Sequence, residues 1–144
     1  MSRNEADTRA ELIEHKLADS GWGVIAGTLI RREYEITDGR LLGGGRRGKK
    51  LKADYLLFYN GHKLAIVEAK AEGKPVSAAV AQAKNYAHLL DLRMTYATNG
   101  HTIYQIDLLT GEEKEVDQYP TPQALWVQKQ SAANEWLQQY NALP

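Results

Sequence analysis

The order of apolar and polar positions predicts an α/β chain whose centre is a hairpin of two apolar strands. Residues 51–59 and 62–70 are rich in aliphatic, aromatic and β-branched side chains, and Asn60-Gly61 separates them. This dipeptide is typical of a tight hairpin turn. Strands this apolar belong at the centre of a sheet that is covered on both faces.

Before the hairpin, residues 4–19 predict a helix, with Asn4 as a suitable N-cap and Gly21 as the residue that ends it. Its apolar stripe at helical spacing consists of Ala6, Ala10, Ile13 and Leu17. Residues 22–37 then predict one long strand, or two strands broken near Gly27. The polar second half of this segment is typical of a sheet edge.

After the hairpin, residues 76–90 predict a second helix, because small and apolar residues recur at helical spacing. Its stripe consists of Ala79, Ala83, Tyr86 and Leu90. Further strands are expected at residues 93–98, 102–108 and 113–116, and a last helix from residue 121 or 122 to about 140.

The sequence favours one main domain over residues 1–118, followed by a linker and terminal helix over residues 119–144. Tyr119-Pro120-Thr121-Pro122 interrupts regular structure. The last helix carries apolar side chains with little chain left to bury them, namely Leu125, Trp126, Trp136 and Leu137. We therefore expect the chain to be a fragment of a longer protein.

Composition narrows the classes of protein without selecting one. The 144 residues are 43% hydrophobic and 25% charged, as in an ordinary globular domain, and the formal net charge is zero. The absence of Cys excludes disulfides and thiolate metal sites, and the four His do not have zinc-site spacing. No apolar run approaches the roughly 20 residues of a membrane span, and no signal peptide is evident, so we expect a cytoplasmic protein.

Positive charge is concentrated in one part of this neutral chain. Residues 31–52 hold eight Lys or Arg against three acids, and residues 38–50 predict a glycine-rich loop. Gly43-x4-Gly48-Lys49 resembles a Walker A loop, but Lys50 replaces the Ser or Thr that would hold magnesium, and a strand follows instead of a helix. We expect a loop that contacts DNA phosphates, or alternatively a solvated loop without such a role. Its basic side chains are Arg46, Arg47, Lys49 and Lys50.

The hairpin also carries charges where core strands seldom hold them. Asp54 lies near the start of its first strand, and Glu68-Ala69-Lys70 ends its second. Two carboxylates, with the Ala69 carbonyl as a further ligand, suit Mg²⁺, with Mn²⁺ as a substitute. Lys70 would orient a water and stabilise the transition state of phosphodiester hydrolysis.

The strand register decides whether this chemistry is possible. A two-residue turn with regular pairing would place Asp54 opposite Val67, which would put Asp54 and Glu68 on opposite faces of the sheet. An odd turn or a β-bulge is therefore required, and we predict a three-residue turn over residues 60–62. The expected pairs are Phe58 with Leu64, Leu56 with Ile66, and Asp54 with Glu68.

These residues resemble a known nuclease signature. Asp54, thirteen residues and Glu68-Ala69-Lys70 resemble the PD-(D/E)xK motif, with Ala53 in place of its proline. Gln82-x3-Tyr86 resembles the QxxxY motif of the RecB-like branch. The plainer interpretation is that Gln82 is an ordinary polar residue of a helix and that Tyr86, one turn away, belongs to the core. The chain from about residue 4 to 126 is similar to the N-terminal domain of type I restriction enzyme R (HsdR) subunits. The segments that carry this wider similarity are Asn4-Glu5-Ala6-Asp7-Thr8-Arg9, Gly21-Trp22-Gly23, Ile30-Arg31-Arg32-Glu33-Tyr34, Gln82-Ala83-Lys84-Asn85-Tyr86-Ala87, Thr98-Asn99-Gly100 and Tyr119-Pro120-Thr121-Pro122.

The resemblance implies a restriction-endonuclease-like α/β core, with a mixed central sheet flanked by helices. It implies that Asp54 and Glu68 bind the metal, that Lys70 is catalytic, and that Gln82 and Tyr86 support cleavage. A glutamate of the first helix would be an additional metal ligand. Glu5 fits the family pattern best, with Glu11 and Glu14 as alternatives.

The resemblance also implies a Mg²⁺-dependent endonuclease that cuts double-stranded DNA and works with modification and specificity subunits. ATP would be used by motor domains of the full-length subunit and not by this chain. Two other functions remain open at this stage: a DNA-binding or subunit-docking module that is inactive alone, and a repair nuclease of the same superfamily.

Overall fold

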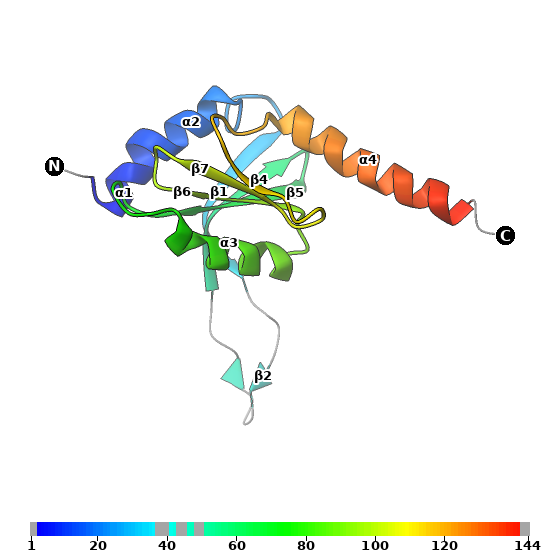
Figure 1. The fold of residues 1–144 in the computed structure, drawn as a ribbon, viewed down its shortest axis with the longest axis horizontal. Helices are drawn as coiled ribbons and strands as arrows, with labels where there is room; N and C mark the ends of the chain where they lie inside the picture. Colours follow the sequence, from blue (N-terminus) through cyan, green and yellow to red (C-terminus); the bar gives the residue numbers. More distant parts are fainter. Residues whose placement is uncertain (1–2, 37–40, 43–45, 48–50, 142–144) are drawn as a thin grey trace.

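The computed structural model describes residues 3–36, 41–42, 46–47 and 51–141, with side chains of the last helix described as far as residue 134. Within these residues, six strands form one sheet in the order β1-β4-β5-β6-β7-β8 (Figure 1). Their bounds are β1 (Thr28–Ile36), β4 (Leu51–Tyr59), β5 (His62–Ala69), β6 (Met94–Thr98), β7 (Ile103–Asp107) and β8 (Glu113–Val116). Among the described strand pairs of this sheet, β5 and β6 are the one parallel pair, and α3 (Ser77–Leu89) connects them. The expected mixed sheet with flanking helices is confirmed.

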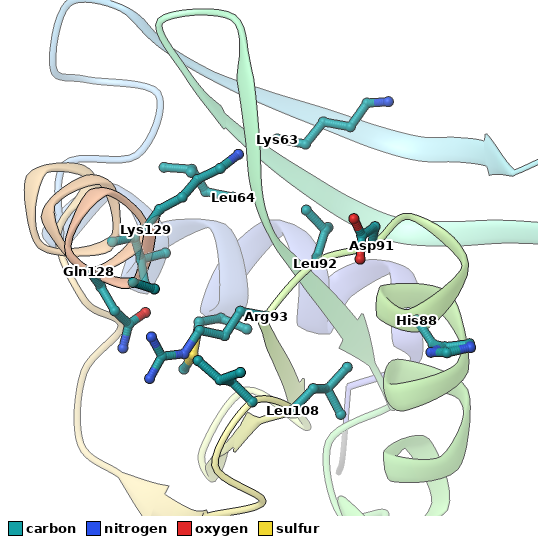
Figure 2. A pocket seen from close by; sticks show the side chains of 13 residues that line it. Lys63, Leu64, His88, Asp91, Leu92, Arg93, Leu108, Gln128 and Lys129 are labelled. Carbon is teal, nitrogen blue, oxygen red and sulfur yellow. The ribbon is translucent and has the colours of Figure 1, made fainter. Parts of the chain in front are cut away.

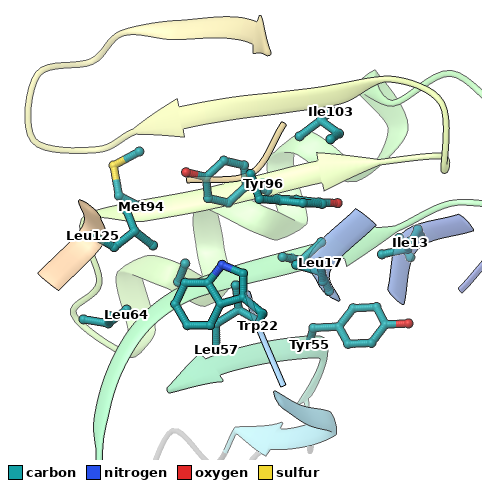
Figure 3. Close-up of a cluster of buried hydrophobic side chains, with 14 residues drawn as sticks. Ile13, Leu17, Trp22, Tyr55, Leu57, Leu64, Met94, Tyr96, Ile103 and Leu125 are labelled. Atoms are coloured by element: carbon teal, nitrogen blue, oxygen red, sulfur yellow. The ribbon is translucent and has the colours of Figure 1, made fainter. Parts of the chain in front are cut away.

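Helices cover both faces of the sheet (Figure 1). The N-terminal helical segment lies over one face and α3 over the other. On the first face, a cluster of buried apolar side chains joins the sheet to the N-terminal helix, and Figure 3 shows Ile13, Leu17 and Trp22 within it. On the second face, Tyr86 and Ala87 of α3 pack with Leu56 and Ile66. Within the described ranges, no helix is long and apolar enough to cross a membrane.

The N-terminal helical segment differs from a regular helix at its centre. It consists of α1 (Glu5–Thr8), a π-helical turn η1 (Arg9–Ile13) and α2 (Glu14–Asp19). Asn4 caps it as predicted, since its Oδ1 accepts a hydrogen bond from the Asp7 amide at 2.8 Å. The predicted apolar stripe is confirmed for Ile13 and Leu17, which are buried, and is wrong for Ala6 and Ala10, which are exposed. Thr8 is buried in their place.

The π turn explains this difference in the buried face. Thr8, Ile13 and Leu17 are each 0% exposed, and their spacing is five and then four residues. A π turn takes one more residue than an α turn, so the buried face moves by one position across it. Such turns are frequent at functional sites, and this one begins at Arg9.

The segment after this helix is a turn and not the start of a strand. Residues 21–27 contain Gly21, Gly23 and Gly27 at positive φ, and β1 begins only at Thr28. Trp22 is nonetheless part of the core, at 1% exposure, and its Nε1 donates to the Pro120 carbonyl at 2.9 Å. The prediction of an edge strand is confirmed for β1.

The segment expected as a loop between β1 and β4 contains a short antiparallel pair. It consists of β2 (Leu41–Leu42) and β3 (Arg46–Arg47). In Figure 1 this pair lies away from the main body, beyond the ends of β1 and β4.

The last helix, α4 (Pro122–Asn141), starts on the body and extends away from it (Figure 1). Tyr119 and Leu125 belong to the main core at 3% and 4% exposure. Trp126 is half-buried and its ring packs against the rings of Tyr59 and His62. The sequence suggested that the apolar side chains of this helix lack packing partners, but the first turns of α4 do pack on the body. The side chains of Trp136 and Leu137 lie outside the described residues.

Candidate active site

The turn of the central hairpin has two residues and not the predicted three. Asn60 and Gly61 have φ of 50° and 81°, and Tyr59 pairs with His62. Positive φ at both central residues is the geometry that favours Asn-Gly in a two-residue hairpin turn. The prediction of an odd turn was therefore wrong.

A β-bulge supplies the shift that the odd turn was expected to supply. Phe58 pairs with Lys63, whereas Leu57 pairs with Ala65, so that Leu64 is the extra residue of β5. The predicted Phe58–Leu64 pair is consequently wrong, and the predicted Leu56–Ile66 pair is confirmed. Beyond the bulge the strands have the register in which Asp54 and Glu68 share one face.

Hydrogen bonds across the strands confirm that Asp54 and Glu68 are neighbours. The Asp54 amide donates to Glu68 Oε1 at 3.0 Å, and the Ala69 amide donates to Asp54 Oδ2 at 2.7 Å. Glu68 is 2% exposed, and the Asp54 side chain is 16% exposed. Burial, and next the charge of Asp54, raise the pKa of the Glu68 carboxyl well above its ordinary value. A buried carboxyl beside a second carboxylate is an electrostatically costly arrangement that a cation would relieve.

The donor set at this pair suits magnesium. Among the described residues, no three His, Cys, Asp or Glu side chains gather closely enough to hold a metal together. Mg²⁺ does not need such a cage, because it retains several waters and is commonly held by one or two carboxylates together with substrate phosphates. Asp54 and Glu68 could therefore hold Mg²⁺, with the Ala69 carbonyl as the predicted third ligand.

Lys70 follows directly after β5. Its backbone amide donates to the Thr98 carbonyl at 2.8 Å, which fixes the main chain at this point against the end of β6. Alternation along the strand places Lys70 on the same face as Glu68. Within the part of the chain that the structure describes, its half-buried side chain forms no ion pair.

Arg9 is a site residue that the sequence did not single out for this role. Its Nη2 contacts Asp54 Oδ1 and lies 2.7 Å from Glu5 Oε1, and its Nη1 lies 3.6 Å from Glu33 Oε1. The guanidinium of Arg9 thus lies among three carboxylates. Arg9, Asp54 and Glu33 line a cavity of about 240 Å³, together with Ala6, Glu14, Arg32 and Tyr55.

Glu33 was also missed, and its backbone conformation is unusual. It lies between the pairs Arg32–Tyr55 and Tyr34–Ala53, and hence opposite Asp54. Its φ is 51°, in the left-handed region that residues other than Gly, Asn and Asp seldom adopt. No sequence pattern indicates positive φ at a glutamate within a strand.

The three candidate glutamates of the first helix have different surroundings. Glu5 lies beside Asp54 through their shared contact with Arg9. Glu14 accepts hydrogen bonds from the Tyr55 hydroxyl and from Arg32, and Glu11 pairs with Arg3. Glu5 and Asp54 thus share their contact with Arg9, Glu14 lines the same cavity as Asp54, and the role of Glu5 as an additional ligand stays a prediction.

Gln82 and Tyr86 form one hydrogen-bonded unit on α3. Gln82 Nε2 donates to the Tyr86 hydroxyl at 2.5 Å. Tyr86 is 4% exposed and packs in the same cluster as Leu56 and Ile66, which lie two positions from Asp54 and Glu68 on their strands. The Gln82 amide is therefore exposed on the α3 side of the sheet, whereas Asp54 contacts Arg9 of the N-terminal helical segment.

The predicted basic DNA contacts belong to the segment between β1 and β4. Arg46 and Arg47 form β3, and their side chains lie outside the described residues, as do Lys49 and Lys50 altogether.

A larger cavity, of about 360 Å³, lies at the opposite ends of the strands from the carboxylates. Lys63 and Leu64 at the start of β5, Arg93, and Gln128 and Lys129 of α4 line part of it (Figure 2). Among the described residues that line it, Asp91 is the one carboxylate. This larger cavity lacks the pair of Asp54 and Glu68 and is not the candidate active site.

Comparisons with known proteins point to one family. Residues 44–126 match the family model described as the second domain of the type I restriction enzyme EcoKI endonuclease subunit. The chain is 32% identical over 132 residues to the type I restriction enzyme EcoAI endonuclease subunit of Escherichia coli, covering 85% of this chain and 16% of that protein. It also matches the solved structure of a fragment assigned to the HsdR subunit of a type I restriction enzyme from Vibrio vulnificus YJ016. That match has a TM-score of 0.77 and 42% identity and covers 88% of this chain and 25% of the other.

Proposed function

Since the chain belongs to the family of type I restriction enzyme R (HsdR) endonuclease subunits, we propose that it is the nuclease domain of such a subunit and hydrolyses phosphodiester bonds of double-stranded DNA with Mg²⁺. The chain spans about a sixth of the length of the curated relative that it matches. The motor activity that would use ATP to move DNA is assigned in this proposal to other domains of a full-length subunit.

The observation that carries the proposal is the cross-strand pair of Asp54 and Glu68. Each carboxylate accepts a hydrogen bond from the backbone of the other strand, so the hairpin itself fixes their separation. When bound, Mg²⁺ would polarise the scissile phosphate and acidify the attacking water. The two carboxylates supply the negative charge that holds this cation, and Mn²⁺ meets the same ligand preference.

The remaining residues have roles that follow from their positions. Lys70 follows Glu68 on the same face, which supports our assignment of its ammonium to orienting the attacking water and stabilising negative charge on the phosphate. Gln82 offers an exposed amide to the DNA, and the buried hydroxyl of Tyr86 orients it. Arg46, Arg47, Lys49 and Lys50 are proposed to contact phosphates, which gives affinity without sequence specificity.

The proposal places sequence recognition outside this chain. The net charge of zero gives no general attraction to DNA. Specificity and modification subunits of a restriction complex are therefore the proposed partners that bring DNA to the site.

Cleavage of supercoiled plasmid DNA tests the proposal. The chain, with Mg²⁺ or Mn²⁺, is expected to nick plasmid, and Lys70→Ala is expected to lower the rate by about 10²-fold or more, as for loss of a group that acts in the transition state. Lys74→Ala is the matched control, because Lys74 lies four residues away in an exposed turn. Undiminished nicking by Lys70→Ala would contradict the assignment. DNA binding without any cleavage by the unaltered chain would favour a docking module instead.

A further inference from the structure

We propose that Arg9 is a resident cation of the metal site, which competes with the divalent ion for Asp54 and thereby lowers the affinity of the metal-free protein for it. This inference rests on the proposed function, because it takes Asp54 as a metal ligand. Arg9 is a positioning residue in this account, since it acts through the carboxylate and not on the phosphate.

The contacts of Arg9 support the competition. Asp54 Oδ2 accepts the hydrogen bond of the Ala69 amide, and Asp54 Oδ1 is in contact with Arg9 Nη2. Both oxygens of the carboxylate therefore already have partners. A metal ion that binds through Oδ1 must displace the guanidinium or accept a positive charge a few ångströms away.

The surroundings of Arg9 allow it to release Asp54 without leaving the cavity. Glu5 Oε1 lies 2.7 Å from the same Nη2, and Glu33 Oε1 lies 3.6 Å from Nη1. These carboxylates are more exposed than Asp54, at 43% and 65% against 16%. The guanidinium can thus shift toward the outer carboxylates when the inner one is taken by a metal.

The guanidinium of Arg9 contacts these carboxylates, but its hydrogen bonds are incomplete. Within the described residues, its Nε is buried and has no hydrogen-bond partner. A guanidinium fixed for structure alone normally has its buried donors satisfied. Its partners at the guanidinium are carboxylates, which are also the ligands that a divalent cation prefers.

Arg32 provides a matched control in the same cavity. It carries the same charge and lines the same cavity, but its guanidinium pairs with Glu14. Replacing either arginine by glutamine changes the net charge equally. Only Arg9→Gln removes the cation that contacts Asp54.

Calorimetric titration of the metal-free chain with Mn²⁺, in the absence of DNA, tests the inference. Arg9→Gln is expected to bind Mn²⁺ about tenfold more tightly than the unaltered chain, which corresponds to ~1.4 kcal/mol. Arg32→Gln should stay within about twofold, and Arg9→Lys, which keeps the charge, should gain less than Arg9→Gln. A variant that folds poorly would lose affinity, so a gain cannot arise from damage.

Two outcomes would overturn the inference, and they are distinguishable. If Asp54→Asn abolishes Mn²⁺ binding but Arg9→Gln binds no more tightly than Arg32→Gln, Arg9 is only a structural ion pair and the proposed metal site stands. If Asp54→Asn binds Mn²⁺ as well as the unaltered chain, the metal assignment of the proposed function fails, and the competition fails with it.

Discussion

The backbone amide of Asp54 donates a hydrogen bond to the Glu68 carboxylate at 3.0 Å, across strands β4 and β5. This bond joins residues fourteen positions apart in the sequence, and it depends on the bulge at Leu64. A register shifted by one residue would turn one of the two side chains to the other face. The geometry of the carboxylate pair is therefore a property of the whole hairpin.

Glu68 is expected to destabilise the metal-free protein at neutral and higher pH. Its folded-state pKa is raised by burial and by Asp54, so its favourable contribution is fully present below the unfolded pKa, near 4.5, and is lost as pH rises toward the folded value. Glu68→Gln removes this dependence because the amide does not titrate. We expect the unfolding free energy of Glu68→Gln, relative to that of the unaltered chain, to increase by about 1–3 kcal/mol from pH 5 to pH 8.

Urea unfolding of both proteins in the presence of a chelator measures this difference at the two pH values. Titrating groups that do not interact with Glu68 are common to both proteins and cancel in the comparison. A difference in unfolding free energy that does not change with pH would show that Glu68 titrates normally in the folded state.

Gln82 and Tyr86 are expected to act as one unit. Tyr86→Phe removes the hydroxyl that accepts from Gln82 but keeps the buried ring, so the cost in stability should stay below about 1.5 kcal/mol. Cleavage by Tyr86→Phe should fall, because the Gln82 amide loses its anchor. In the Gln82→Ala background, Tyr86→Phe should have no further effect on the cleavage rate. Equal and additive losses in a double-mutant cycle would mean that the two side chains act separately.

Glu72 is expected to hold the segment after Lys70 against the N-terminal helix. It accepts hydrogen bonds from the Arg3 amide and Nη1 at 2.9 Å each and pairs with His101 Nε2 at 2.5 Å, while its amide donates to Thr8 Oγ1 at 2.9 Å. The hydrogen bonds from Arg3 and His101 lower the pKa of Glu72 to about 2. Its stabilising effect is thus present above the unfolded pKa, near 4.5, and is lost as pH falls through about 2.

Thermal unfolding of Glu72→Gln tests this role. The variant should have a lower Tm than the unaltered chain at pH 6, and the difference should shrink as pH approaches 2. Glu112→Gln is a suitable control, since the Glu112 side chain is 62% exposed and pairs with Lys114 on the surface. Equal Tm changes for the two variants at pH 6 would argue against a special role for Glu72.

The sequence was sufficient to predict most helices and strands and the charged residues of the hairpin. It was insufficient to predict backbone geometry that depends on tertiary contacts. Apolar content and the Asn60-Gly61 turn predicted β4 and β5, and parity showed that an irregularity was needed to bring Asp54 and Glu68 together. The alternation of side chains along the two strands does not determine where the irregularity lies. A three-residue turn and a bulge at Leu64 produce the same strand register at Asp54 and Glu68.

The contacts around Arg9 could not have been predicted for a related reason. The regular helical period placed Ala6 and Ala10 on the buried face, but the π turn from Arg9 to Ile13 moves that face and brings Thr8 into the core. The approach of Glu33 depends on positive φ at a strand residue, which has no local sequence signal. Both features lie beside Asp54, where packing outweighs local preference.

Anomalous X-ray scattering from crystals soaked in Mn²⁺ tests the central claim most directly. The hairpin register predicts a peak that is coordinated by the carboxylates of both Asp54 and Glu68, and that is absent from crystals of Asp54→Asn treated in the same way. A Mn²⁺ peak elsewhere, with Asp54 and Glu68 free of metal at a saturating Mn²⁺ concentration, would contradict the account.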